Sequence, residues 1–266
     1  MKAIRLRLCL LFLASTLTLG LGARSSAAVI FQDDFTGVTS LNAAGWYFQN
    51  SSGGTAWSLS TSTDSPLSGN VMVNTGGNTP NTRAIKSFSP VTLGLGERLI
   101  VRFDHGVDVN TGLNLRVGFT ENRLTSNQLN SPMDFEYAYG FGLGSGVPPA
   151  ATSIGFRDGD SGNGIGSAST TAVRDGFAHS YEFVLERTAT GLLMTVFIDG
   201  EATTPLQTSI TNYTFNYLSF GQSMGGARLD NISVAFVPEA SSTLLMGAGL
   251  LVLGLPLWLR RRRTRA

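Results

Sequence analysis

The middle of the chain alternates apolar and polar positions with the two-residue period of a β-strand. In Leu113–Phe119 every odd-numbered position is apolar, and the positions between them hold Asn, Arg and Gly. Such a segment predicts a strand with one buried face and one face toward solvent. Similar patterns predict further strands at 99–103, 135–141, 213–220 and 232–236.

A hairpin is predicted near residue 190. Large apolar residues recur at every second position of Tyr181–Leu185, residues 188–191 form a turn, and Leu192–Ile198 returns as the second strand. Asp199-Gly200 follows. This dipeptide is typical of tight turns because both residues tolerate a positive φ.

Composition and length indicate that these strands belong to one domain. The chain has 32 glycines among 266 residues and few runs of strong helix formers, so short strands joined by turns are expected. The roughly 210 residues between the two ends suit a single hydrophobic core. We therefore expect an all-β, antiparallel β-sandwich at 29–236. The glycine-rich segments Ser145–Ala151 and Gly159–Ala172 are expected to be long loops.

The N-terminus has the three parts of a secretory signal. Met1–Arg7 carries three positive charges, Leu8–Leu21 is apolar, and 26–28 offers the small side chains that signal peptidase accepts. We expect cleavage after Ala28, which makes residues 1–28 the signal peptide.

The C-terminus carries a second apolar segment. Residues 240–259 contain no charge, and a helix of about 20 residues spans roughly the 30 Å hydrocarbon core of a bilayer. Four arginines follow directly: Arg260, Arg261, Arg262 and Arg263. Basic residues beside a span stay on the cytoplasmic side. We therefore expect a transmembrane helix at 240–259, a basic tail at 260–266 and an extracytoplasmic domain before them.

The order of these C-terminal parts resembles the PEP-CTERM sorting signal. Its motif is Val237, Pro238, Glu239 and Ala240, and Ala240 stands where the family usually has a second proline. The resemblance covers residues 237–266. It implies a Gram-negative bacterium, processing by a membrane enzyme of the exosortase type, and export to the cell surface or the extracellular exopolysaccharide matrix.

The middle of the chain resembles concanavalin A-like, or laminin-G-type, β-sandwich domains. The resemblance rests on the hairpin Ser180–Gly200, on the opening Phe31–Phe35 and on the closing Leu229–Val234. In that jelly-roll fold the first and last strands lie side by side. The resemblance therefore implies that the opening Asp-Asp-Phe and the closing Leu-Asp-Asn meet.

This meeting would gather four oxygen-bearing side chains: Asp33, Asp34, Asp230 and Asn231. Hard oxygen ligands suit Ca²⁺, so a calcium site that ties the chain ends together is one interpretation. The other is that these residues only cap turns. A second acidic segment, Asp158–Gly164, lacks the glutamate of an EF-hand loop because Ser169 stands in its place. It is expected to be a turn without metal.

One acidic pair fits the spacing of catalytic carboxylates in glycoside hydrolases. Asp134 and Glu136 lie two residues apart, so on a strand they share one face. Sandwich hydrolases of this broad fold carry such acids in a Glu-x-Asp-x-x-Glu pattern. Here Tyr137, Ala138 and Tyr139 follow, so the third acid is missing. The alternative is that both acids are solvated strand residues.

The residues present disfavour other enzymatic, metal-binding and nucleic-acid-binding functions. Gly221–Gly225 has the spelling of a serine-hydrolase nucleophile elbow, but both histidines precede it and a strand pattern follows, so a connection between strands is expected. With two histidines, two lysines and a single cysteine, Cys9, inside the signal, the mature chain offers no zinc set and no phosphate-binding Gly-Lys loop. Residues 29–238 hold ten basic and seventeen acidic residues, a formal charge of −7, which disfavours nucleic acid.

The sequence therefore predicts an exported, non-enzymatic protein of the cell surface or matrix that acts in adhesion or carbohydrate binding. Trp46 and Trp57 either stack on sugar rings or fill the core. Two alternatives stay open. One is a polysaccharide hydrolase or lyase that uses Asp134 and Glu136, and the other is a purely structural surface component.

Overall fold

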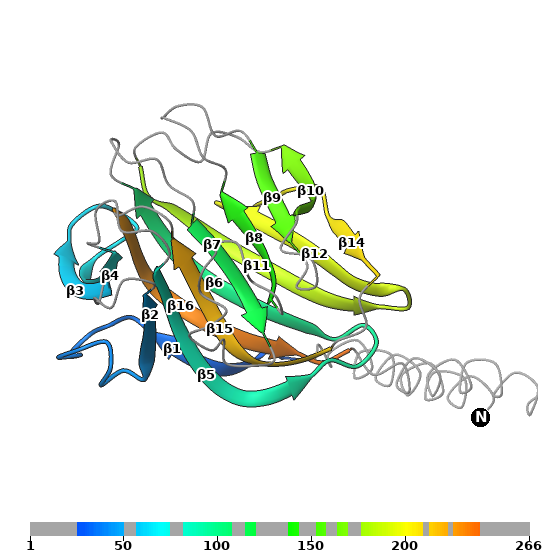
Figure 1. The fold of residues 1–266 in the computed structure, drawn as a ribbon, viewed down its shortest axis with the longest axis horizontal. Coiled ribbons are helices and arrows are strands. Elements are labelled where there is room, and N and C mark those ends of the chain that lie inside the picture. Colours follow the sequence, from blue (N-terminus) through cyan, green and yellow to red (C-terminus); the bar gives the residue numbers. More distant parts are fainter. Residues whose placement is uncertain are drawn as a thin grey trace, which may run out of the picture. The chain divides into compact units, whose positions relative to one another are not determined.

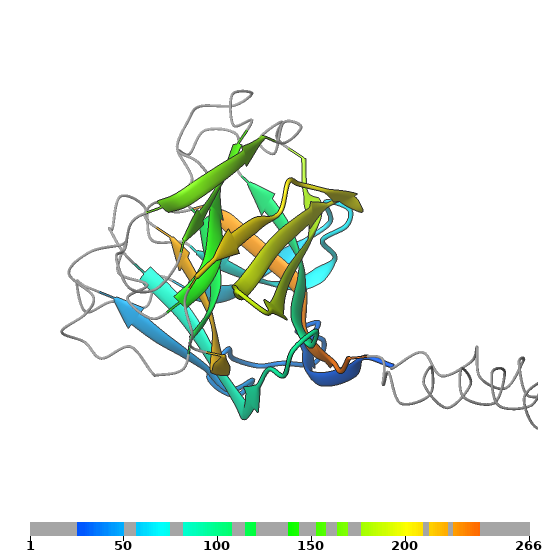
Figure 2. The ribbon, with the colours of Figure 1, turned by 90° about the vertical axis from the view of Figure 1, so that its right-hand side faces the viewer.

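The computed structural model describes residues 26–50, 57–74, 82–107, 115–120, 138–143, 153–157, 164–169, 177–209, 213–222 and 226–239. Their regular structure consists of strands, with no helix among the described residues. All strand pairs are antiparallel and belong to two sheets. Figures 1 and 2 show the two sheets as facing layers. The prediction of an all-β, antiparallel sandwich is confirmed.

The first sheet has nine strands, and its main order is β13-β12-β11-β6-β16-β4-β3. In addition β1 pairs with β16, and β14 pairs with β12. The bounds are β1 Ala28–Asp33, β3 Trp57–Ser62, β4 Gly69–Asn74, β6 Arg98–Val107, β11 His179–Thr188, β12 Gly191–Ile198, β13 Glu201–Ala202, β14 Leu206–Thr208 and β16 Ala227–Val237.

The second sheet has seven strands in the order β10-β9-β8-β7-β15-β5-β2. The bounds are β2 Trp46–Asn50, β5 Thr82–Thr92, β7 Leu115–Thr120, β8 Ala138–Leu143, β9 Ser153–Arg157, β10 Gly164–Ser169 and β15 Thr214–Gln222. The expected loop at Gly159–Ala172 is wrong in its middle part, because β10 pairs there with β9. The side chains of β10 are small and give no apolar alternation, so the sequence pattern does not indicate a strand there.

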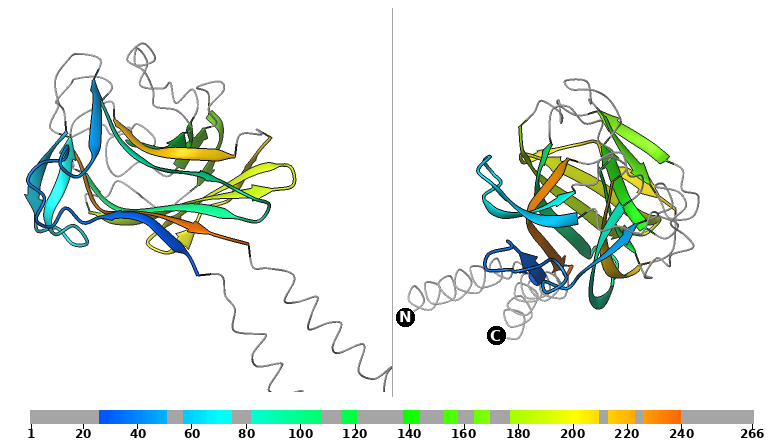
Figure 3. Two further views of the ribbon diagram at one scale, coloured as in Figure 1. Left: turned by 90° about the horizontal axis from the view of Figure 1, so that it is seen from below. Right: turned by 60° about the vertical axis from the view of Figure 1, so that its left-hand side comes forward.

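The two ends of the domain lie side by side, as predicted. β1 pairs with the second half of β16, from Ala28 opposite Phe236 to Asp33 opposite Ile232. The same edge of β16 pairs with β4 at Arg228 and Leu229. The blue and orange strands in Figure 3 show this pairing. Residues Ala27–Val237 form one compact unit.

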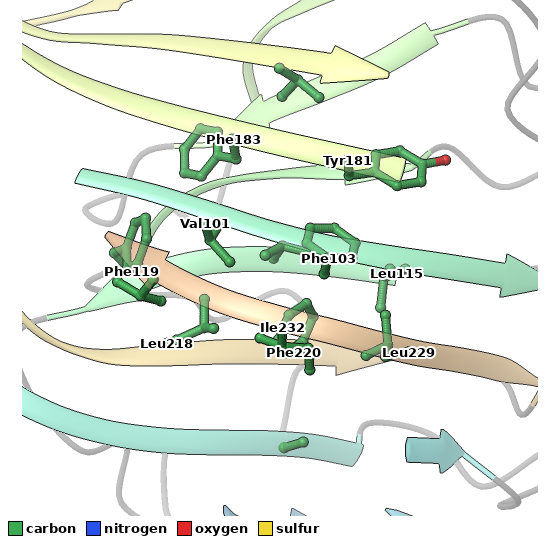
Figure 4. Close-up of a cluster of buried hydrophobic side chains, with 14 of the residues drawn as sticks. Val101, Phe103, Leu115, Phe119, Tyr181, Phe183, Leu218, Phe220, Leu229 and Ile232 are labelled. Atoms are coloured by element: carbon green, nitrogen blue, oxygen red, sulfur yellow. The ribbon is translucent and has the colours of Figure 1, made fainter. Parts of the chain in front are cut away.

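The core fills the space between the sheets. Inward residues of β6, β11 and β16 meet inward residues of β7 and β15 (Figure 4). Phe103 and Phe220 are in edge-to-face contact across this space, with ring centroids 5.2 Å apart, and both are at most 2% exposed. Alternation along each strand places the remaining residues on the outer faces.

The predicted hairpin is present. β11 and β12 pair from Tyr181 opposite Ile198 to Thr188 opposite Gly191. Asp199 and Gly200 both have positive φ, 51° and 86°, as a tight turn of the primed type requires.

The predicted signal peptide and tail fall largely outside the described residues. Among the residues that the structure does describe, no helix is long and apolar enough to span a bilayer. The predicted span at 240–259 lies outside them, and so do residues 1–25. Val237 ends β16, and Pro238 and Glu239 follow it without regular structure.

Candidate functional site

A pocket of about 560 Å³ lies on the outer face of the nine-stranded sheet. Two adjacent cross-strand rows supply its side chains: Ser180 opposite Asp104, and Glu182 opposite Arg102. We call it the outer-face pocket. It is lined by Arg102, Phe103, Asp104, Ser180, Tyr181, Glu182, Phe197, Gly200, Asn231 and Ser233. A volume of this size is typical of small-ligand sites.

The polar side of the pocket is a hydrogen-bond network centred on Asp104. Ser180 Oγ donates to Asp104 Oδ1 over 2.5 Å, and Asn231 Nδ2 donates to Asp104 Oδ2 over 2.7 Å. Asp104 is 9% exposed. The network fixes the directions in which Ser180 and Asn231 present their remaining donors and acceptors.

A β-bulge in β16 places Asn231 in this network. The register moves from Asp230 opposite Asp104 to Ser233 opposite Arg102, so β16 holds one extra residue. Asn231 has a φ of 51°, a conformation that Asn adopts more readily than most residues. Because of the bulge, Leu229 and Ile232 stay in the core, as their burial shows, while Asn231 between them is exposed on the outer face.

The opposite side of the pocket has an aromatic wall. The side chain of Phe197 packs against a small outer-face cluster of Ile100, Val184 and Val237. Next to it, Arg102 Nε donates to Glu182 Oε2 over 2.5 Å. A partly buried phenyl ring beside hydroxyl, amide and carboxylate groups is suited to a ligand with one apolar face and several hydroxyls.

Asp230 lies directly behind the network and is 1% exposed. Its carboxylate accepts hydrogen bonds from the backbone N–H of Ser68 and of Asn231. Burial raises the pKa of this carboxyl above its usual range. The two hydrogen bonds lower the pKa, and the charges of Asp104 and Asp34 raise it. Two buried carboxylates directly opposite each other make this edge of the pocket electronegative.

This pKa predicts a specific pH dependence. The folded protein binds the Asp230 proton more tightly than the unfolded chain, so the contribution of Asp230 to stability falls as pH rises above about 3.8. Asp230→Asn removes this titration. The free energy of unfolding of the wild type, minus that of the variant, should therefore decrease with pH through this window. Urea denaturation of both proteins at a series of pH values measures this difference in the free energy of unfolding. A difference that does not change with pH would contradict a raised pKa of Asp230.

Each of the predicted calcium ligands has a hydrogen-bond partner within the protein. Asp33 Oδ2 lies 2.5 Å from Lys86 Nζ and accepts a hydrogen bond from Trp46 Nε1. Asp34 accepts one from the backbone N–H of Thr36. Within the described part of the chain, no group of three or more His, Cys, Asp or Glu side chains is arranged to hold a metal ion. A calcium site built from Asp33, Asp34, Asp230 and Asn231 stays a prediction.

The other predicted residues fall into three groups. Asp134, Glu136 and the segment 158–163 lie outside the described residues. Trp46 and Trp57 are 1% and 3% exposed, so they fill the core and offer no platform to a sugar. Gly221 and Gln222 end β15 and β16 begins at Ala227, which confirms that the segment 221–225 leads from one strand to the next.

The sequence predictions missed most of the outer-face pocket. Asp104 lies just beyond the predicted strand 99–103, and Ser180 and Phe197 entered only as positions of the predicted hairpin. A signal was present, because these residues alternate with large apolar positions and so share the outer face. Which strands are neighbours decides that they meet, and local alternation does not contain that information.

The fold resembles the jelly-roll sandwiches of lectin-like and galectin-like solved structures. Among solved structures it is similar to the globular domain of T. cruzi calreticulin, with a TM-score of 0.56 and 10% identity over 82% of this chain and 92% of that one. It is also similar to the carbohydrate recognition domain of Emp47p, with a TM-score of 0.53 and 11% identity over 81% and 98%.

A third similar structure is an endo-1,3-beta-glucanase from Streptomyces sioyaensis, with a TM-score of 0.54 and 14% identity over 80% of this chain and 98% of that chain. At these identities the likeness concerns the fold alone. No protein-family model matches the sequence, and no curated protein matches it.

Proposed function

We propose that this protein is an exported component of the cell surface or matrix whose β-sandwich binds glycans in the outer-face pocket. The single observation that carries the proposal is the combination, in one pocket, of a partly buried phenyl ring with an oriented Asp–Ser–Asn network. Sugar rings have an apolar C–H face and a rim of hydroxyls, so they need both kinds of contact.

Two further observations support this proposal. One similar structure is described as a carbohydrate recognition domain and another as a glucanase. The sorting motif at 237–240, with the apolar segment and the basic tail after it, supports export, membrane anchoring and processing by an exosortase-type enzyme.

Removing the aromatic wall should weaken glycan binding. Phe197→Ala is expected to lower the affinity for a bound oligosaccharide about tenfold, because the stacking surface is lost. A glycan array identifies the oligosaccharide, and isothermal titration measures its dissociation constant. Leu193→Ala is the matched control, because Leu193 is a half-buried apolar residue on the same face of β12 outside the pocket. Equal affinities for both variants would contradict the assignment of the site.

Export can be tested through the lysines. The only lysines are Lys2 and Lys86, and the Lys86 side chain is 13% exposed and paired with Asp33. If signal peptidase cuts after Ala28, native protein recovered from cells should take up one amine-reactive label, at its new N-terminus. Intact mass measures this and reports tail processing as well. A second label that maps to Lys2 would show that the signal is retained.

The glucanase among the similar structures favours one second candidate, a polysaccharide hydrolase that uses Asp134 and Glu136. Turnover of a polysaccharide that disappears in the double variant Asp134→Asn, Glu136→Gln would establish it. Binding without turnover would leave the non-enzymatic function.

A further inference from the structure

The charges around the outer-face pocket are unbalanced. Three of its lining residues carry a charge, namely Arg102, Asp104 and Glu182. Arg102 is already neutralised by Glu182, with 2.5 Å between Nε and Oε2. Asp104 receives its two hydrogen bonds from a hydroxyl and an amide, which are neutral donors.

Two further acidic residues lie near the pocket. Asp230 lies directly opposite Asp104 in the sheet, and its two hydrogen bonds come from backbone N–H groups. At the rim, Asp199 pairs with His179, with 2.7 Å between Oδ2 and Nδ1. Among the hydrogen bonds and ion pairs of the described residues, Asp104 and Asp230 have no cationic partner.

The two sheets also differ in where their acidic residues lie. The strands of the seven-stranded sheet contain no Asp or Glu, and their charged residues are Arg83, Lys86, Arg116 and Arg157. The carboxylates of the described strands therefore belong to the nine-stranded sheet. A carboxylated or sulfated sugar that enters the outer-face pocket meets the like charge of Asp104, which is 9% exposed and therefore screened less than a surface charge.

We infer that the outer-face pocket selects its glycan by charge: it accepts uncharged or amine-bearing saccharides and excludes saccharides with carboxylate or sulfate groups. This inference rests on the proposed glycan-binding function and names its ligand class. Glu182 is the residue that sets the exclusion, because it both adds a negative charge and occupies the one arginine able to pair with a ligand carboxylate.

The experiment compares three probes of matched length on the full-length protein in detergent: a neutral glucan oligosaccharide, an oligogalacturonate, and an oligomer of deacetylated glucosamine. Isothermal titration at low and at high salt gives each dissociation constant. We expect the neutral and amine-bearing probes to bind, and the oligogalacturonate to bind at least roughly tenfold more weakly.

Glu182→Gln should relax this selectivity by freeing Arg102, and so bring the affinity for oligogalacturonate to within a few-fold of the neutral probe. Glu186→Gln is the matched control. It makes the same change of charge on the same face of the same strand, opposite Arg98 and outside the pocket. It should leave the selectivity unchanged.

The possible outcomes distinguish charge selection from glycan binding itself. Oligogalacturonate binding as tightly as the neutral probe in the wild type overturns charge selection, while glycan binding stands. Equal effects of Glu182→Gln and Glu186→Gln also overturn it, because net charge and not the pocket would then decide. If no probe and no member of a glycan array binds, the proposed function fails and the inference fails with it.

Discussion

Replacing Lys86 by methionine is expected to lower the free energy of unfolding by about 3–5 kcal/mol, because it leaves the Asp33 carboxylate buried without its counter-charge. The side chains of Lys86 and Asp33 are 13% and 15% exposed. Lys86 Nζ also donates to the backbone carbonyl of Ala44. The rings of Phe31 and Trp46 flank it, with Nζ 5.0 and 5.5 Å from the ring centroids.

This cluster holds three elements together. Asp33 ends β1, Lys86 lies in β5 of the opposite sheet, and Trp46 begins β2. The ammonium group therefore connects β1 of the nine-stranded sheet to β2 and β5 of the seven-stranded sheet, and its loss should loosen β1 and its pairing with β16.

Urea denaturation followed by tryptophan fluorescence measures the effect, since Trp46 lies in the cluster. Arg102→Gln is the control, because it breaks an ion pair whose side chains are 48% and 28% exposed. Such a pair is worth about 1 kcal/mol or less. A loss in Lys86→Met no larger than in this control would show that the cluster does not hold the strands. The double variant with Asp33→Asn should recover part of the loss, since it removes the unpaired charge.

Phe220→Ala is expected to cost about 3–5 kcal/mol of folding stability, as large-to-small changes in a packed core do. Phe220 is fully buried, and it lies on β15, an interior strand of the seven-stranded sheet. Its ring meets Phe103 of the nine-stranded sheet at 5.2 Å and Trp46 at 6.0 Å. The substitution would therefore open a cavity between the two layers.

Two controls define this effect. Phe220→Leu keeps an apolar side chain of similar volume and should cost about 1.5 kcal/mol or less. Leu95→Ala removes a side chain that is 56% exposed and should change stability by no more than about 0.5 kcal/mol. If Phe220→Ala behaved like Leu95→Ala, the contact between the sheets at this position would be wrong. Chemical denaturation of the three variants decides between these results.

Much of the fold could be predicted from local patterns. Alternation along 181–185 and 192–198, with Asp199-Gly200 after them, is enough to identify a hairpin, because side-chain direction in a strand has a period of two. β10 could not be found in this way, since its residues Gly164–Ser169 are small and give no contrast between the faces.

The candidate site was less accessible to prediction. Asp230 and Asn231 were singled out as metal ligands, but the bulge of β16 directs the Asn231 amide to Asp104. Asp33 was assigned to the same site, yet it is the last residue of β1 and its carboxylate pairs with Lys86. A one-residue change of register moves a side chain to the other face of a sheet, and neither register nor bulges can be read from a single strand.

The sequence by itself determined that the domain is built of antiparallel strands, that its opening and closing segments are strands, and that its middle carries a negative charge. These properties follow from composition and from short-range periodicity. Only the tertiary structure decided that β6, β11, β12 and β16 lie side by side and so gather Asp104, Ser180, Phe197 and Asn231 around one pocket. The physical reason is that strand neighbours are chosen by packing between residues far apart in the chain.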